Sequence, residues 1–395
     1  MATQEEEDLQ VPIPELLGKV LDHEGSDLHL TAGAPPVVRV HGELERIEGY
    51  PAMSPRALQG MIYAILPQKL RERFEQELEL DMSYSLPGRA RFRVNVYMQR
   101  DAIGAAFRVI PFEIKAIDEL GLPSVVADLA RFQRGFVVVT GPTGSGKSTT
   151  LASMVDVVNT ERKGHIMTVE DPIEFLHKHK SCIVNQREVG ADTHGFSTAL
   201  KHVLRQDPDV ILVGEMRDLE TISTAITAAE TGHLVFATLH TQDAPQTIDR
   251  IIDVFPPHQQ QQVRVQLATT LMGVVTQQLI PTSDGHGRVA AIEVLVTTPA
   301  VRNLIREGKV HQIYSSMQAG GRFGMQTMDM SLAQHVKAGH ITQQLAFERC
   351  HDPEELTRLM GGAGLGAGPT DGGGAMDMGG GMGGQSGGGM VMGGM

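Results

Sequence analysis

The sequence predicts an α/β protein in which a doubly wound, largely parallel sheet follows a smaller α/β region. In the second part of the chain, short apolar runs typical of buried parallel strands alternate with helical stretches. A glycine-rich phosphate-binding motif stands between one of these runs and the following helix. In the first part, basic and apolar residues alternate along one long extended run, as in a half-buried strand.

Charge and cysteine content exclude several classes of protein. The 395 residues carry a net charge of −13, whereas a general nucleic-acid binder needs excess cations for the phosphate backbone. Two cysteines are too few for a disulfide framework or a four-thiolate zinc site. The acidic first residues differ from a secretory signal, and no apolar run approaches the ~20 residues of a membrane span. We therefore expect a cytoplasmic protein with no transmembrane segment.

The first predicted domain covers residues 1–112. Apolar residues at helical spacing predict a short helix within 11–25. Two extended segments bounded by Gly and Pro follow at 27–33 and 35–44. A helical stretch is predicted from residue 54 to about 79.

A further extended run, from Arg89 to Arg100, has a basic side and an apolar side. Arg89, Arg91 and Arg93 alternate with apolar residues, which predicts a half-buried strand with a basic face. Arg108 follows in the next segment. A solvated strand face is the plain interpretation of these charges.

A hinge is predicted at residues 113–122, between this domain and a second one at 123–360. Four short apolar runs of the buried parallel type define the second domain, and helical stretches separate them. These runs are 135–140, 165–170, 209–214 and 233–240.

The phosphate-binding motif is a complete G-x-x-x-x-G-K-[ST] signature in the required context, after a strand and at the start of a helix. Its glycines let backbone N–H groups turn toward phosphates. Lys147 can reach the β- and γ-phosphates, and the Ser148 hydroxyl can ligate Mg²⁺. The predicted nucleoside triphosphate site comprises Gly141, Pro142, Thr143, Gly144, Ser145, Gly146, Lys147, Ser148 and Thr149.

Carboxylates at the ends of two predicted strands are candidates for catalysis, because ligands bind where the strands of such sheets end. Glu170 ends one strand. The next four residues, 171–174, look like a helix start, with Asp as N-cap and Glu three residues later. That capping role accounts for Asp171 and Glu174 but not for Glu170, which we expect to handle the attacking water.

Glu215 follows the next apolar run and is predicted to lie beside the phosphate loop, where it would hold the Mg²⁺ shell. A salt bridge with Arg217 is the alternative interpretation. Spacing alone leaves open whether Glu170 or Glu215 is the general base, because geometry decides such roles before pKa.

Two histidines flank a further apolar run. His240 ends it at the same predicted sheet edge as the phosphate loop, where it could sense the γ-phosphate. His233 precedes the run and is the weaker candidate. A packed, hydrogen-bonded core role is the alternative for both.

The last segment, 361–395, holds 18 of the 44 glycines and six of the 20 methionines. Such a composition cannot bury enough apolar surface to offset its ordering entropy, so we predict a disordered tail.

From about residue 12 to 360 the chain resembles the secretion ATPases of type IV pilus and type II secretion systems. SDLHLTAG and PPVVRVHGEL resemble the start of the PAS-like N-terminal domain of this family. GPTGSGKSTT is similar to its Walker A motif, TVEDPIEF to its aspartate box, ILVGEMRD to its Walker B element and GHLVFATLHT to its histidine box. The resemblance implies a RecA-like P-loop core that hydrolyses ATP with Mg²⁺.

The segment AVRNLIREGKVHQI resembles a helix of the pilus-retraction branch of this family, and GMQTMDMSL is similar to that branch too. Ala300, Val301, Leu304 and Ile305 are predicted to share one face of the helix. A plain amphipathic surface helix is the alternative. Assembly-type relatives usually carry an extra domain and a paired-CxxC zinc site, which this sequence does not contain.

The resemblance also implies partners and further site residues. Arginines of the N-terminal domain would reach the nucleotide and neutralise charge in the transition state; the candidates are Arg91, Arg93, Arg100 and Arg108. A homohexamer docked on an inner-membrane platform protein, at the inner face of the cytoplasmic membrane, would extract pilin subunits and so support twitching motility.

Three other functions stay open on sequence alone. A pilus-extension or type II secretion ATPase of the same family is one. A nucleic-acid translocase shares the motor core, although the net charge of −13 opposes it. A nucleotide-gated scaffold that does not hydrolyse ATP is the third.

Overall fold

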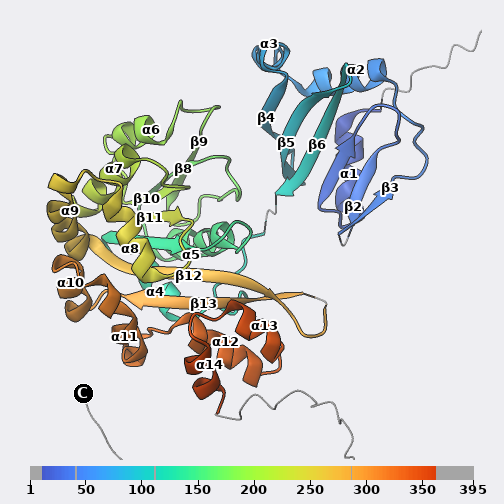
Figure 1. Ribbon diagram of the computed structural model, residues 1–395. Helices are drawn as coiled ribbons and strands as arrows, with labels where there is room; N and C mark the ends of the chain where they lie inside the picture. The colour runs from blue at the N-terminus through green and yellow to red at the C-terminus, as the bar shows by residue number, and fades with distance from the viewer. Residues whose placement is uncertain (1–10, 41, 111–112, 286, 362–395) are drawn as a thin grey trace, which may run out of the picture.

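Two separate sheets form the framework of the structure (Figure 1). The residues that the computed structural model describes are 11–40, 42–110, 113–285 and 287–361. The start of the first predicted domain, residues 1–10, and almost all of the predicted tail, residues 362–395, lie outside them. Within the described ranges, every helix is too short or too polar to cross a bilayer.

The first sheet has six strands, all antiparallel to their neighbours, in the order β3-β2-β1-β6-β5-β4. Its core contains the apolar sides of three helices and of the central strands. The strands are β1 (Asp27–Leu30), β2 (Val37–Val40), β3 (Glu43–Arg46), β4 (Glu79–Leu86), β5 (Ala90–Gln99) and β6 (Ala102–Ile110); the helices are α1 (Ile13–Asp22), α2 (Pro55–Ile65) and α3 (Gln68–Glu77).

The helical stretch predicted at 54–79 is two helices, because a proline interrupts it. Ser54 caps α2 by accepting a hydrogen bond from the backbone N–H of Ala57. Leu66 then adopts an extended conformation before Pro67, as the residue before a proline prefers. The chain restarts as α3, which ends at Leu78 in the left-handed region.

The predicted strand with a basic face is confirmed as β5. Its apolar residues Phe92, Val94 and Val96 are buried, whereas Arg93 is exposed on the other face. A two-residue turn of Arg100 and Asp101 connects β5 to β6, and both residues have positive φ, as type I′ hairpin turns require.

The second sheet has seven strands in the order β13-β12-β7-β11-β10-β8-β9. Every neighbouring pair is parallel except β12 with β13. The strands are β7 (Gly135–Thr140), β8 (His165–Glu170), β9 (Ile183–Glu188), β10 (Val210–Val213), β11 (Leu234–Leu239), β12 (Leu271–Pro281) and β13 (Arg288–Val296).

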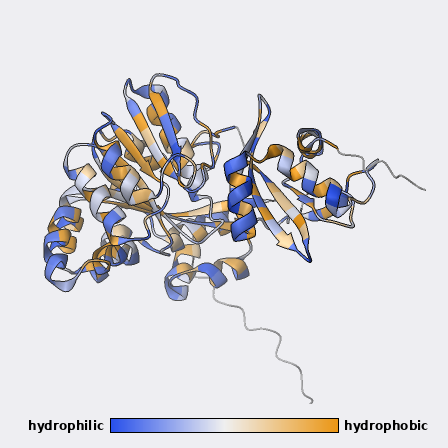
Figure 2. Ribbon diagram, turned by 90° about the horizontal axis from the view of Figure 1, so that it is seen from above, coloured by the Kyte–Doolittle hydropathy of each residue, from blue (hydrophilic) through white to orange (hydrophobic). Residues whose placement is uncertain are grey.

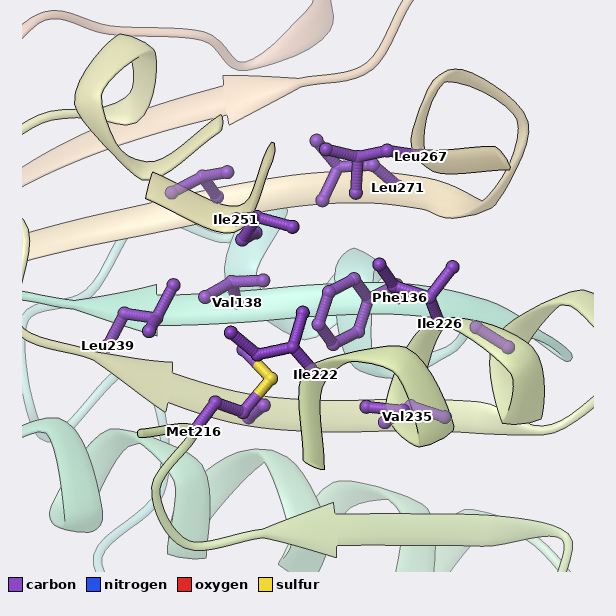
Figure 3. Packing of buried hydrophobic residues seen from close by; sticks show 14 of the residues in the cluster. Phe136, Val138, Met216, Ile222, Ile226, Val235, Leu239, Ile251, Leu267 and Leu271 are labelled. Atoms are coloured by element: carbon purple, nitrogen blue, oxygen red, sulfur yellow. The ribbon is translucent and has the colours of Figure 1, made fainter. Parts of the chain in front are cut away.

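Helices cover both faces of this sheet, so the predicted doubly wound fold is confirmed. Phe136 and Val138 of β7 pack with Ile222 and other apolar side chains on one face (Figure 3), while alternate residues of β7 pack on the other. Hydrophobic colour concentrates on the central strands in Figure 2. The helices are α4 (Val125–Ala130), α5 (Lys147–Glu161), α6 (Phe196–Val203), α7 (Leu219–Glu230), α8 (Ala244–Asp253) and α9 (Pro257–Thr270).

The remaining helices follow β13. Helices α12 to α14 form a small cluster with the distal part of the β12–β13 hairpin. Val301 and Ile305 of α10 are buried, whereas Ala300 on the same predicted face is exposed. Ala300 lies in the first turn, beyond the core. These helices are α10 (Pro299–Arg306), η1 (Val310–Gln312), α11 (Ile313–Gln318), η2 (Gly321–Phe323), α12 (Met328–Lys337), α13 (Gln343–Arg349) and α14 (Pro353–Met360).

Glu293 connects three elements from inside the protein. Its buried carboxylate on β13 accepts hydrogen bonds from the backbone N–H of Ala244 at 2.8 Å and of Met328 at 3.4 Å, at the starts of α8 and α12. Burial raises the pKa of Glu293 to about 8.

Candidate functional site

The carboxyl ends of the parallel strands bring most of the predicted site residues to one edge of the second sheet. The phosphate loop follows β7, Glu170 ends β8, Glu215 follows β10, and His240 follows β11. His233 precedes β11 and therefore lies at the opposite edge, where its Nδ1 is 2.9 Å from the carbonyl oxygen of Ala228. Its hydrogen bond fits the packing role, not a role at the nucleotide.

The phosphate loop lies so close to β12 that glycine is required at two positions. Gly141 has φ +136°, and a Cβ there would lie 2.2 Å from the carbonyl oxygen of Gln277. Gly146 has φ +90°, and its Cβ would lie 2.9 Å from Nε2 of the same glutamine. Both the left-handed backbone and the close approach exclude a side chain.

Gln277 is a site residue that sequence reasoning missed. It is fully buried on β12, its Nε2 donates to the carbonyl oxygen of Ser145 at 2.5 Å, and its Oε1 accepts from Thr150 Oγ1 at 2.8 Å. These bonds fix the loop and the first turn of α5 to each other. The only sequence signal is a polar pair, Gln277 and Gln278, inside an apolar run.

Lys147 begins α5 and folds back over the loop. Its Nζ donates to the carbonyl oxygens of Gly141 at 2.9 Å and Pro142 at 3.0 Å. Burial lowers the pKa of Lys147, while the negative charges of Glu215 and Glu174 raise it. The ammonium therefore lies within the electrostatic influence of two carboxylates, at the loop whose motif binds phosphates.

Glu215 makes the salt bridge that we considered as the alternative. Its Oε2 accepts from Arg217 at 2.7 Å, and its Oε1 is 3.0 Å from His240 Nε2. The hydrogen bond from Arg217 lowers the pKa of Glu215, and the charge of Arg217 and the contact with His240 act in the same direction. The half-buried carboxylate is thus ionised and lies in the field of Lys147.

The helix start predicted at 171–174 was wrong: no helix or strand occurs between β8 and β9. Side chains of β9 take the backbone donors that a helix would use. The N–H of Ile173 donates to Glu188 at 3.1 Å, and that of His177 donates to Gln186 at 2.8 Å. Local spacing could not reveal these acceptors, because they come from the next strand.

Two glutamates of this segment, Glu170 and Glu174, lie in different surroundings. The carboxylate of Glu170 accepts from Thr168 Oγ1 at 2.6 Å and from Gln186 Nε2 at 3.1 Å, and burial raises its pKa. Glu174 has no helix to cap, is exposed, and acts electrostatically on Lys147. Glu174 is therefore a second missed candidate.

The four predicted arginines do not converge on one point of this chain. Arg91 contacts the second sheet, where its Nη2 donates to Glu188 at 2.7 Å. Arg93 and Arg108 face each other on neighbouring strands, and Arg108 also pairs with Asp27 at 2.8 Å. Arg100 lies in the β5–β6 turn, nine residues from Arg91, which corresponds to about 30 Å along a strand.

Within the described part of the chain, no three His, Cys, Asp or Glu side chains form a group that could hold a metal ion. In nucleotide sites, Mg²⁺ is usually bound by one or two protein ligands and the phosphates rather than by a protein cage. Ser148 in the first turn of α5 and ionised Glu215 supply ligands of the required type.

Comparison with known proteins identifies the family. The model of the family described as type II/IV secretion system protein matches residues 114–286. The type IV pilus retraction ATPase PilT of Pseudomonas aeruginosa is 53% identical over 344 residues, which cover 87% of this chain and 99% of PilT. The chain belongs to the PilT branch of the type II/IV secretion ATPases.

Two further comparisons agree with this assignment. A twitching motility protein of Neisseria gonorrhoeae is 49% identical, and the match covers 82% of this chain and 86% of that protein. A crystal structure of the pilus retraction motor PilT with bound ADP superposes with a TM-score of 0.84 at 49% identity, covering 88% of this chain and 99% of that one. The protein is thus a pilus retraction ATPase with a P-loop core.

Proposed function

We propose that the chain works as a homohexameric ring that hydrolyses Mg·ATP at residues 141–149 and uses the energy to withdraw pilin subunits through an inner-membrane platform protein. The observation that carries the proposal is the complete phosphate loop after β7, with Lys147 folded back over it, in a chain that spans 99% of PilT. The sequence predicts a cytoplasmic location, at the inner face of the membrane.

Lys147, Ser148 and the loop N–H groups would hold the triphosphate. The start of α5 adds partial positive charge at the same place. Phosphate oxygens would replace the carbonyl oxygens of Gly141 and Pro142 as partners of the Lys147 ammonium. Ser148 and Glu215 would complete the surroundings of Mg²⁺, which supplies charge neutralisation on the substrate.

Glu174 is the carboxylate that we propose for the attacking water. It is exposed and lies in the field of Lys147, whereas Glu170 already accepts two side-chain hydrogen bonds. A general base needs a free oxygen within reach of the water, so Glu174 fits this role better. Glu170 would have a supporting role next to Glu174. His240 would sense the γ-phosphate through its contact with Glu215.

The arginines would divide between subunits of the ring. Arg91, Arg93 and Arg108 occupy the half of β5 and β6 nearer to the linker, and the Arg100 turn lies at the other end of these strands. A single nucleotide within one subunit cannot meet both ends. Arg93 and Arg108 would serve one nucleotide, Arg91 would act through its contact with Glu188, and Arg100 would face another subunit.

Deletion of the gene, followed by microscopy of labelled pili, tests the proposed function. Pili that extend and no longer withdraw would support it. In parallel, the purified chain should release phosphate from ATP in the presence of Mg²⁺ and form hexamers. Pili that fail to extend would favour the assembly role, while negligible phosphate release under all magnesium and lipid conditions would favour the non-hydrolysing scaffold.

A further inference from the structure

We propose that Glu188 is a positioning residue that couples the N-terminal sheet to the acidic segment 171–174, with Arg91 as its partner. The proposal rests on the proposed function, because it assigns the contact a role in ATP hydrolysis. Glu188 ends β9 and pairs in register with Glu170 at the end of β8. It therefore lies at the sheet edge that carries the candidate site.

One carboxylate joins three parts of the chain. Oε2 of Glu188 accepts from Arg91 Nη2 at 2.7 Å and from the backbone N–H of Ile173 at 3.1 Å. Its Oε1 accepts from Ser83 Oγ at 3.2 Å, and Arg91 Nη2 also donates to that Oγ at 2.6 Å. Ser83 and Arg91 belong to β4 and β5 of the first sheet, whereas Ile173 immediately precedes Glu174.

The contact is buried, which separates it from ordinary surface ion pairs. The side chains of Arg91 and Glu188 are only 15% and 7% exposed. Solvent and salt screen such a pair weakly, and removal of one partner leaves a buried charge without compensation. Nε of Arg91 is buried without a hydrogen-bond partner among the described residues, so the guanidinium depends on Nη2 for its polar contacts there.

The segment after β8 depends on this carboxylate for its shape. It contains no helix or strand, and the N–H groups of Ile173 and His177 bond to side chains of β9. A shift of Arg91 therefore acts on the same oxygen that holds the backbone next to Glu174. Since misplacement of a catalytic group by about 1 Å can cost 10²-fold in rate, the first sheet can control hydrolysis through Glu188.

The test compares Arg91→Gln, Glu188→Gln and the double variant in the full chain. We expect each single change to lower kcat about tenfold with little change in KM, and the double variant to be no worse than either one. Hydrogen exchange in peptides from residues 171–181 should rise in Arg91→Gln, although the changed residue lies in the other sheet. If the losses of kcat in the two single variants add up in the double variant, the proposed coupling is wrong. It is also wrong if hydrogen exchange rises only within the first sheet.

Arg89→Gln is the matched control. It removes an arginine two residues earlier whose pair with Asp22 is exposed, with side chains 48% and 56% accessible. This variant should leave kcat and hydrogen exchange at residues 171–181 unchanged.

The charge swap Arg91→Glu with Glu188→Arg is a second test. It restores an ion pair between the sheets, but an arginine cannot accept a hydrogen bond from the Ile173 N–H, so kcat should stay low. Full recovery of kcat in this variant would show that the contact acts only as an ion pair, and would overturn the proposal. A wild type without ATPase activity would contradict the proposed function instead, while the exchange measurement would still test the coupling.

Discussion

Lys147 shows how a single side chain is prepared for an anion. Burial of the ammonium disfavours its charge and lowers the pKa of Lys147, and the charges of two carboxylates offset only part of this effect. Its present acceptors are backbone carbonyl oxygens of its own loop, which are weaker partners than phosphate oxygens. Binding of a triphosphate therefore exchanges neutral acceptors for charged ones.

Replacement of Lys147 by Ala is expected to abolish nucleotide binding and pilus retraction together, because it removes the charge that faces the phosphates. Titration with a fluorescent ATP analogue measures the affinity. Lys163→Ala is the control, since Lys163 is exposed and lies before β8, at the opposite edge of the sheet. Unchanged affinity in Lys147→Ala would refute the site assignment.

Glu174→Gln is expected to lower kcat by about 10²–10⁴-fold while ATP still binds, because the amide cannot accept a proton. Glu170→Gln should cost less, since it can keep its hydrogen bonds with Thr168 and Gln186 through rotation of the amide. Single-turnover phosphate release distinguishes the two variants. A larger loss in Glu170→Gln would return the water-activating role to Glu170.

The stability of the fold should depend on pH through Glu293. Its pKa is raised from an ordinary value of 4.5 to about 8, so the folded state binds a proton that the unfolded state has lost between these values. The associated stabilisation is complete below about pH 4.5 and disappears as the pH rises through 8. Glu293→Gln should therefore gain in Tm relative to wild type between pH 6 and pH 9. A difference in Tm that stays constant across this pH range would contradict this.

At the scale of elements, hydrophobic periodicity predicted the central strands of the second sheet and the strand with a basic face in the first. The alternation along β5 and the apolar runs of β7, β8, β10 and β11 were sufficient, because each depends on residues close in sequence. The segment at 171–174 was mispredicted, since its backbone bonds go to Gln186 and Glu188 of the next strand. Gln277 was missed for the same reason: its partners lie in the phosphate loop, far earlier in the chain.

Helix α10 should separate retraction from hydrolysis. Leu304 is half-buried, and Ile305 is fully buried against the core. We expect Leu304→Ala with Ile305→Ala to impair retraction, seen by microscopy of pili, more than phosphate release. Ile305→Ala alone serves as the folding control and should lower the free energy of unfolding by about 2–5 kcal/mol. Equal losses of retraction and hydrolysis in the double variant would show that α10 contributes to folding and has no specific role in retraction.

At the scale of the whole molecule, the proposed ATP hydrolysis would use residues of both sheets. The first supplies arginines, and the second supplies the phosphate loop and the acidic residues. The linker between them and the buried contact of Arg91 with Glu188 connect the two. Nucleotide contacts that favour one arrangement of the sheets over another can therefore produce movement.

Removal of residues 361–395 should leave ATPase activity within about twofold of wild type, because a segment of this composition buries little apolar surface. Size-exclusion chromatography should still show hexamers. A longer deletion from residue 353 is the contrasting case: it removes α14, whose Leu356 is fully buried, and should destabilise the chain. Loss of hexamers in the shorter deletion would contradict the predicted tail.

Gln277 on β12 determines how short an expressed fragment can be while it keeps an intact phosphate loop. Gln277 stands 132 residues after Ser145 and yet holds the loop that bears the signature. A fragment that stops before β12 would carry every residue of the motif and lack the amide that shapes it. The shortest piece worth expressing for nucleotide-binding studies must therefore run through the β12–β13 hairpin, and a motif match in a shorter open reading frame is poor evidence of activity.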